Sequence, residues 1–140
     1  MGWGCLAIIG VAVLFGAIGS LTEHRQDETL SPAERAAKQK EEIALGRAIW
    51  GARRLRDSAR NPDSFKLTQV LITADGTACY TYGAQNGFGG MNVGFAALTA
   101  TLQFKTDEMS GFHGLWDKRC ANKTGVDKTR VVEYGLEHAT

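Results

Sequence analysis

The sequence has few of the residues that usually carry enzyme chemistry or hold a cofactor. Its three histidines, His24, His113 and His138, are scattered, and no Cys or His pair has the spacing of a zinc site. His113 lies about two helical turns before Cys120, which is too far for a thiolate–imidazole pair. Walker and GxSxG sequences are also missing. We therefore expect no catalytic residue, no metal, no cofactor and no enzymatic activity.

An excess of charge of one sign is missing as well. The chain of 140 residues holds 16 basic and 15 acidic side chains, so its formal net charge is +1. This balance provides no general field that attracts nucleic acid or an acidic substrate. We expect neither nucleic acid nor a small-molecule substrate among its partners.

One long apolar run is present. Residues Trp3 to Leu21 include no charged residue, and about 19 residues can cross a hydrocarbon core of roughly 30 Å as a helix. A polar stretch follows from Glu23. The sequence thus predicts a transmembrane anchor at 1–21, a polar connector at 22–30 and a single domain at 31–140. A signal peptide cleaved before Ser20 and a buried core helix are the alternatives. The signal lacks a basic start, and so long a helix is rarely buried on all faces.

Three small residues share one face of the expected anchor. Ala12, Gly16 and Ser20 lie four residues apart, a spacing that lets two membrane helices approach closely. They are candidates for contact with another membrane protein, and a simple anchor is the alternative.

A long helix is expected after the connector. Ser31-Pro32-Ala33-Glu34 has the residues of a capped helix start, and Asn61-Pro62-Asp63-Ser64 favours a turn that ends it. Between them an apolar stripe at helical spacing should pack on the core. Its members are Leu45, Ala48, Ile49, Ala52, Leu55 and Ala59.

The remainder reads as an antiparallel meander. Strands are expected at Phe65–Ile72, Thr77–Gln85 and Met91–Lys105, the last with a bulge or break near Ala97 where the apolar phase slips. A short helix is expected at Gly111–Ala121 and an edge strand at Thr129–Leu136. The fold class is therefore α+β. A transmembrane helix precedes a long helix packed on a three- or four-stranded antiparallel sheet, with a short C-terminal helix.

Two aromatic residues lie outside the predicted core. Trp50 is on roughly the opposite helix face from the stripe, and is either covered by another part of the fold or offered to a partner. Phe88 lies in Asn86-Gly87-Phe88-Gly89-Gly90, which joins two strands and so predicts a hairpin rather than a phosphate loop. Both residues are candidates for partner contact.

Arginines crowd the end of the long helix. They could form a patch for phosphate or lipid headgroups, or be cations favoured at a helix C-terminus and on a solvated face. The balanced net charge favours the second explanation. The residues are Arg47, Arg53, Arg54, Arg56 and Arg60.

The middle of the chain has four features in order: a DPDS-like turn within Leu55–Phe65, a strand with Ala78-Cys79, an NxFGG hairpin within Gly83–Gly90, and Trp116 followed by Cys120. In these features it resembles a group of small, uncharacterised bacterial and prophage envelope proteins. The chain has Asn61 where Asp is usual in that turn. The resemblance covers about Leu55 to Cys120 and implies the fold and a Cys79–Cys120 disulfide. It implies no activity.

Location follows from two opposing signals. Arg25, Arg35, Lys38 and Lys40 follow the apolar run and no Lys or Arg precedes it, which favours a cytoplasmic domain. The cysteine pair outside the anchor is two buried thiols or, in an oxidising compartment, one disulfide. Since the resemblance implies the disulfide, we favour the inner (cytoplasmic) membrane with an extracytoplasmic, periplasmic domain.

Together these features predict a non-enzymatic, single-pass membrane accessory or binding protein. Its partner would be another membrane or envelope protein. The alternative is an anchored or secreted inhibitor of an envelope enzyme from a phage or its host.

The apolar run predicts that the full-length protein stays in the membrane pellet during alkaline carbonate washing. The high pH disrupts electrostatic contacts at the membrane surface, but it does not remove a helix from the hydrocarbon core. Immunoblotting of pellet and supernatant measures this, with a peripheral envelope protein as the released control. Mature protein that begins at Ser20 and is found in the soluble fraction would contradict the anchor.

Overall fold

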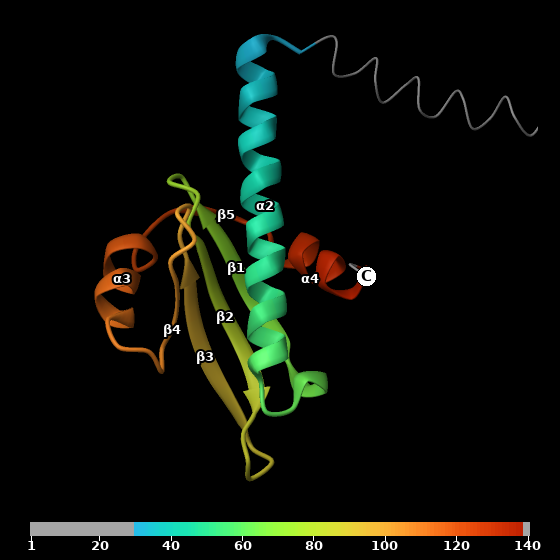
Figure 1. The fold of residues 1–140 in the computed structure, drawn as a ribbon, viewed down its shortest axis with the longest axis vertical. Helices are drawn as coiled ribbons and strands as arrows, with labels where there is room; N and C mark the ends of the chain where they lie inside the picture. Colours follow the sequence, from blue (N-terminus) through green and yellow to red (C-terminus); the bar gives the residue numbers. More distant parts are fainter. Residues whose placement is uncertain (1–29, 139–140) are drawn as a thin grey trace, which may run out of the picture. The chain divides into compact units, whose positions relative to one another are not determined.

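The structure, a computed structural model, describes residues 30–138. In this part of the chain five antiparallel strands form one sheet, and three α-helices pack around it (Figure 1). The predicted α+β class is confirmed. The elements are α2 (Pro32–Ser58), the 3₁₀ helix η1 (Pro62–Ser64), β1 (Lys66–Thr73), β2 (Ala78–Gln85), β3 (Met91–Leu98), β4 (Phe104–Thr106), α3 (Phe112–Arg119), β5 (Gly125–Asp127) and α4 (Thr129–His138).

The chain divides into two units, and the boundary lies inside α2, after Gln39. In the first unit the predicted capping box is formed. The Ser31 N–H donates to Glu34 Oε2 over 2.7 Å, and the Glu34 N–H donates to Ser31 Oγ over 3.3 Å. The hydrogen bonds with Ser31 lower the pKa of Glu34.

The predicted anchor at 1–21, with Ala12, Gly16 and Ser20, lies outside the described residues, as does nearly all of the connector. Between residues 30 and 138, no helix is both long enough and apolar enough to cross a membrane.

The sheet has the strand order β4-β3-β2-β1-β5. β2 and β3 pair in unbroken register, from Ala78 opposite Leu98 to Gln85 opposite Met91. β4 is much shorter and pairs with β3 only from Ala96 to Leu98. The first half of β3 therefore forms an outer border of the sheet.

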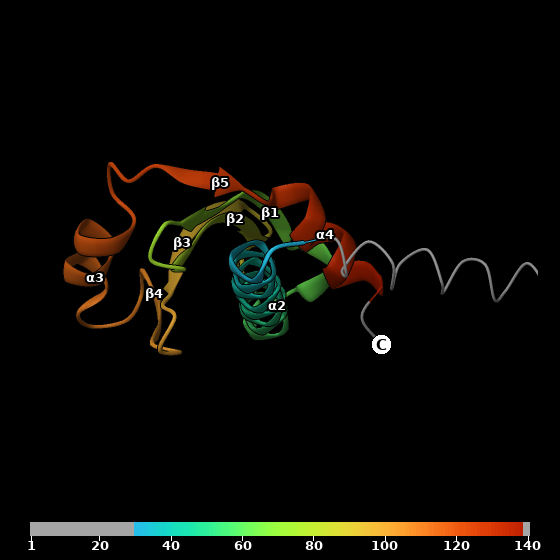
Figure 2. The same ribbon diagram turned by 90° about the horizontal axis from the view of Figure 1, so that it is seen from above.

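α2 packs on one face of the sheet, here called the inner face. Viewed from above, the sheet curves around α2, and α4 lies beside it near β1 (Figure 2). Ala48, Ala52 and Leu55 of the predicted stripe are buried in the core, and Leu45 and Ile49 are partly buried against it. The stripe prediction is confirmed at these positions.

One buried tyrosine fixes how closely α2 approaches the sheet. The hydroxyl of Tyr80, from β2, donates to the Ala48 carbonyl oxygen over 3.0 Å. A Cβ placed on Gly51 would lie only 2.3 Å from this hydroxyl, so a glycine is required there. Burial raises the pKa of Tyr80, which keeps the phenol a neutral donor.

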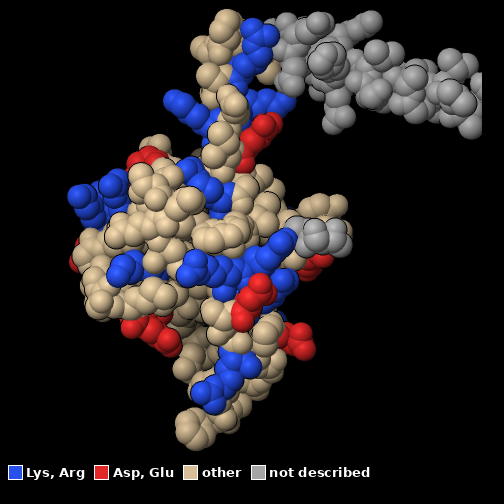
Figure 3. All heavy atoms as spheres, viewed as in Figure 1, with Lys and Arg blue, Asp and Glu red and all other residues tan. Residues whose placement is uncertain are grey.

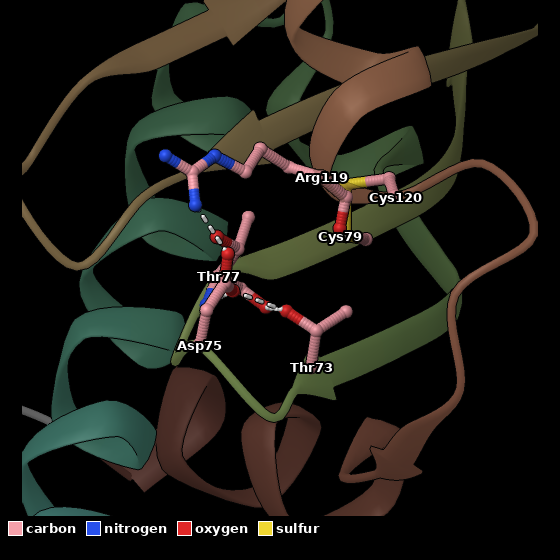
Figure 4. Close-up of a disulfide and its surroundings, with 6 residues drawn as sticks. All are labelled: Thr73, Asp75, Thr77, Cys79, Arg119 and Cys120. Atoms are coloured by element: carbon pink, nitrogen blue, oxygen red, sulfur yellow. Dashed lines mark hydrogen bonds and ion pairs between the residues drawn. A yellow bond between two sulfur atoms is a disulfide. The ribbon is translucent and has the colours of Figure 1, made fainter.

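α3 packs on the other, outer face of the sheet. The disulfide that the resemblance implied is present: Cys79 of β2 is bonded to Cys120, the residue that follows α3 (Figure 4). Ala97 is buried beside the bond, and the partly buried Leu115 and Trp116 pack against it. The bond holds α3 against the outer face near one end of the sheet.

An ion pair next to the disulfide holds the β1–β2 turn. Arg119 Nη1 lies 2.6 Å from Asp75 Oδ2, and Asp75 Oδ1 accepts the Thr73 hydroxyl and the Thr77 N–H (Figure 4). Burial alone would raise the pKa of Asp75, but the hydrogen bonds from Thr73, Thr77 and Arg119 outweigh it and hold this pKa well below its usual range. Asp75 therefore stays ionised and ties the turn to the end of α3.

The sheet differs from the prediction in its number of strands, which is five rather than three or four. The predicted strand Met91–Lys105 is two strands. β3 ends at Leu98, and a turn in which the Thr99 N–H donates to the Gln103 carbonyl over 3.0 Å leads into β4. The expected interruption near Ala97 is therefore a turn, one residue later, and not a bulge. β5 is the other additional strand.

The predicted edge strand Thr129–Leu136 is wrong, because these residues belong to helix α4. Its apolar residues fit either period. Val132 and Leu136 are four apart and face the core, whereas Tyr134 is exposed. Just before the helix, Asp127 forms a turn by accepting the N–H and hydroxyl of Thr129 over 2.9 and 2.6 Å.

The disulfide closes a sequence separation of 41 residues. Replacing Cys79 and Cys120 with Ala should therefore lower the free energy of unfolding by about 2–4 kcal/mol, because the unfolded chain is released. Denaturant unfolding of the full-length chain in detergent measures this, and Cys5→Ala is the matched control without effect. Thiol labelling of denatured, unreduced protein should find one thiol, and three would contradict the bond.

Candidate binding groove and hairpin tip

The loop between β2 and β3 has a shape that Asn86 fixes. Its Oδ1 atom accepts the N–H groups of Phe88 and Gly90, each over 3.0 Å. The Asn86 N–H donates to the Gly90 carbonyl over 2.8 Å, and its side-chain amide donates to Asn92 Oδ1 over 3.1 Å. Gly89 has a φ of +86°, which side-chain-bearing residues rarely adopt. The loop is therefore held in one conformation.

Phe88 lies in this loop and is fully exposed. The hairpin extends beyond the end of the sheet that lies next to the C-terminal end of α2 (Figure 1). The ordered loop therefore presents a large apolar side chain wholly to solvent. The sequence prediction thus singled out a residue that the fold presents to solvent.

Trp50 occupies an intermediate position. Its side chain is 46% exposed and packs edge-on against Phe104 of β4, with the ring centroids 6.5 Å apart. The Arg54 guanidinium lies over both rings, 5.5 Å from the Trp50 centroid and 5.0 Å from the Phe104 centroid. Phe104 therefore covers one side of the ring and solvent reaches the other, and contact of Trp50 with a partner stays a prediction.

A groove of about 900 Å³ connects these two regions. Its walls are the second half of α2 and the inner-face residues of β2, β3 and β4, and Phe88 lines one end. Arg54 and Phe104, which contact the Trp50 ring, also line this groove. The charged residues of the groove are Arg54, Arg60, Asp107 and Glu108.

Tyr82 and Gly94 shape the floor of the groove. A Cβ placed on Gly94 would lie 2.5 Å from the Tyr82 ring, so the ring occupies the space of a β3 side chain. Phe65 supports the ring from the other side, with centroids 5.5 Å apart. Burial, together with the carboxylates of Asp107 and Glu108, raises the pKa of Tyr82 to about 12. The phenol is therefore a neutral hydrogen-bond donor at physiological pH.

The border of the groove is the unpaired half of β3. Backbone groups in an antiparallel strand point alternately to the two sides. Phe95 points away from β2, since its carbonyl accepts the Asp107 N–H over 2.9 Å and its N–H donates to Asp107 Oδ2 over 3.2 Å. Val93 and Met91 therefore point outward too. β4 does not reach them, and no described residue bonds to their outward N–H and C=O groups.

The open border is also apolar and uncharged. Val93 is 66% exposed and Met91 56% exposed, and β3 contains no charged residue. Natural sheets usually protect such edges with lysine, proline or a covering element. The sequence did not lead us to this feature, although the charge-free strand beside a glycine-rich hairpin was a visible signal.

The arginines of α2 are mostly engaged in the fold. Lys and Arg side chains gather on the face that α2 presents (Figure 3). Arg47 donates to the Ala100 carbonyl over 2.7 Å, and Arg56 donates to the Leu136 carbonyl over 3.2 Å and pairs with Asp57. The structural explanation of the arginine cluster is therefore favoured. Arg60, which follows the end of α2, forms no ion pair with any described carboxylate.

A second hollow, of about 910 Å³, lies beside the β1–β2 turn. Ile43, Ala44, Ile72 and Val126 supply apolar lining. Two of its three basic residues are already bonded, Arg47 to Ala100 and Lys128 to Glu41. No group of three His, Cys, Asp or Glu side chains between residues 30 and 138 could hold a metal ion. The first groove, with its open strand border and unpaired Arg60, is the stronger candidate for binding.

Comparison with known proteins finds no matching family, no matching curated protein and no matching solved structure.

The hydrogen bonds of Asn86 predict that Asn86→Ala loosens the hairpin tip. Amide order parameters of Phe88 and Gly90, measured by NMR relaxation on the full chain in detergent, should fall from rigid values to below about 0.6. The control is Asn92→Ala, which removes one side-chain bond and leaves the two bonds to Oδ1. Unchanged order parameters in Asn86→Ala would show that the loop does not depend on Asn86.

Proposed function

We propose that this chain is a non-enzymatic, single-pass membrane accessory or binding protein that contacts an envelope or membrane protein through its hairpin tip and the adjoining groove. The observation that carries this proposal is the fully exposed Phe88 on a hydrogen-bonded loop. Burying a Phe side chain contributes roughly 1.5–3 kcal/mol. This contribution is left for a partner, because the fold does not use it.

The rigidity of the loop supports a role in binding. Ordering a flexible loop on association opposes binding, whereas a loop already fixed by Asn86 avoids that loss. Aromatic side chains in defined positions are the residues that most often dominate interface energies. Phe88 and the half-exposed Trp50 are the two aromatic groups near this groove that meet the description.

The arrangement of the second unit is compatible with a tether. The Lys40 end of the unit lies beside the β1–β2 turn, and the Phe88 tip lies at the opposite end of the sheet (Figure 1). An attachment at Lys40 leaves the tip free for a protein partner. The Cys79–Cys120 bond supports an oxidising, extracytoplasmic compartment.

The rigid, protruding hairpin also favours a second candidate function. A loop of fixed shape with one apolar side chain at its tip is suited to insertion into a cleft, as an inhibitor of an envelope enzyme would require. Detergent-solubilised pull-down with mass spectrometry separates the two functions. A co-purifying integral membrane complex supports the accessory function, and a soluble envelope enzyme whose activity falls on binding supports the inhibitor.

Phe88→Ala should reduce the amount of co-purified partner at least tenfold. Removing an aromatic side chain that anchors an interface costs about 1.4 kcal/mol of binding free energy or more, and this amount corresponds to a tenfold loss of affinity. Thermal stability should change little, since the Phe88 side chain is fully exposed and belongs to neither hydrophobic core cluster of the described residues. Trp50→Ala should weaken co-purification with a small loss of stability from its packing on Phe104.

The matched control is Tyr134→Ala, which removes an exposed aromatic on α4. Equal recovery of partner by wild type and Phe88→Ala would contradict the role of the tip. Unfolding of the domain by Trp50→Ala would place Trp50 in the core and remove it from the interface.

A further inference from the structure

We propose that the groove beside Phe88 binds the free C-terminal end of an extended peptide chain, which adds to β3 as an antiparallel strand. This inference rests on the proposed function and names the chemistry of the partner. Three features carry it: the open backbone of β3, the alternation of side chains across that strand, and the position of Arg60.

The open backbone provides the hydrogen bonds. Met91 and Val93 each direct one N–H and one C=O away from β2, and β4 begins to pair only at Ala96. An extended peptide beside these residues can make up to four main-chain bonds, which is how strand addition to a sheet edge gives affinity. Asp107, bonded to both backbone groups of Phe95, ends the open stretch. The site therefore accepts about four peptide residues.

The two faces of β3 set the side-chain preferences. The peptide residue opposite Val93 points to the outer face, beside the exposed side chains of Met91 and Val93 and the 37%-exposed Phe95. An apolar residue fits there. Its two neighbours point to the inner face, into the groove next to Tyr82 and Arg54. A polar residue there can accept from the neutral Tyr82 hydroxyl.

Charge fixes the direction and the end of the peptide. At the hairpin end of the groove Arg60 is the charged residue, and a Cβ placed on Gly87 would lie 2.7 Å from its Nη1 atom. Asp107 and Glu108 lie toward the other end, beside Phe95. Since β3 runs away from the hairpin, an antiparallel peptide ends at the hairpin and brings its carboxylate to Arg60. The reverse orientation would put its carboxylate beside Asp107 and Glu108.

The register argues against a second copy of the chain on this edge. Two β3 strands paired about Asn92 would place Met91 opposite Val93, and then Gly89 of one copy opposite Phe95 of the other. Asp107 already occupies the position beside Phe95. Pairing about Val93 would place Met91 of one copy opposite Phe95 of the other, where Asp107 again occupies the space. A short peptide end does not extend that far.

Binding of synthetic peptides to the full-length chain in detergent tests the proposal. The probe is an array of randomised seven-residue peptides attached through their N-termini, printed once with free C-terminal carboxylates and once with C-terminal amides. We expect selection of free carboxylates with an apolar residue near the end. For the strongest peptide, fluorescence anisotropy should show at least tenfold weaker binding of the amide.

Two substitutions locate the site. Val93→Pro removes one outward N–H and no bond to β2, so peptide binding should fall at least tenfold while thermal unfolding changes little. Val93→Ala, which keeps the N–H, is its control. If Val93→Pro does not fold, Met91→Pro at the first strand position replaces it. Arg60→Gln should also weaken binding tenfold, whereas Arg130→Gln on α4 should not.

Equal binding of carboxylates and amides, or full binding by Val93→Pro, would overturn the proposal. Absence of any peptide binding would overturn it as well. So would a concentration-dependent dimer in sedimentation that Val93→Pro abolishes, because the edge would then belong to a second copy. If Phe88→Ala still loses the co-purified partner in these cases, the proposed function stands and only the C-terminal peptide is wrong.

Discussion

Tyr80 lies between the sheet and α2, with its side chain fully buried and its hydroxyl bonded to the helix backbone at Ala48. The hydroxyl occupies the space where any side chain at Gly51 would begin, 2.3 Å from a Cβ at that position. Helix and sheet therefore meet at one place with no room to slide. A buried phenol without its acceptor would leave an unsatisfied donor in the core, so the bond selects this position of the helix as well as stabilising it. The wall that α2 supplies to the groove is fixed by this contact.

The other face of the sheet is held differently. There the Cys79–Cys120 bond and the Asp75–Arg119 pair fix the end of α3 near one end of the strands. Because β4 pairs with β3 only from Ala96 to Leu98, the hairpin half of β3 is left without a neighbour on its edge. An open, uncharged edge favours unwanted pairing. On the opposite side of the sheet, Val70 of β1 is bonded to Lys128 and Thr129, whereas no described residue bonds to the outward groups of Met91 and Val93. This difference is the physical reason to connect the β3 edge with binding.

The sequence predicted what depends on local patterns. Ser31 and Glu34 marked the helix start, Ala48 and Ala52 its buried side, and the glycine-rich run around Phe88 the hairpin. It failed where one pattern fits two structures. Val132, Tyr134 and Leu136 alternate as in a strand, yet Val132 and Leu136 are also four apart, and both pack on the core from one face of a helix. β5 was too short to show a period. The disulfide was predicted from the resemblance, since the sequence alone does not show whether Cys79 and Cys120 are free thiols or bonded. The open edge depends on where β4 stops pairing, which no local pattern encodes.

Amide hydrogen exchange along β3 in the free, full-length protein tests whether this edge is open, because it reports which backbone donors lack a partner. We expect the amides of Met91 and Val93 to exchange close to the unprotected rate. The alternating amides of Asn92 and Gly94, bonded to β2, and of Phe95, bonded to Asp107, should be protected. Protection of Val93 equal to that of Gly94 in the unbound protein would show that the edge is already paired, and that it is not free to bind a peptide.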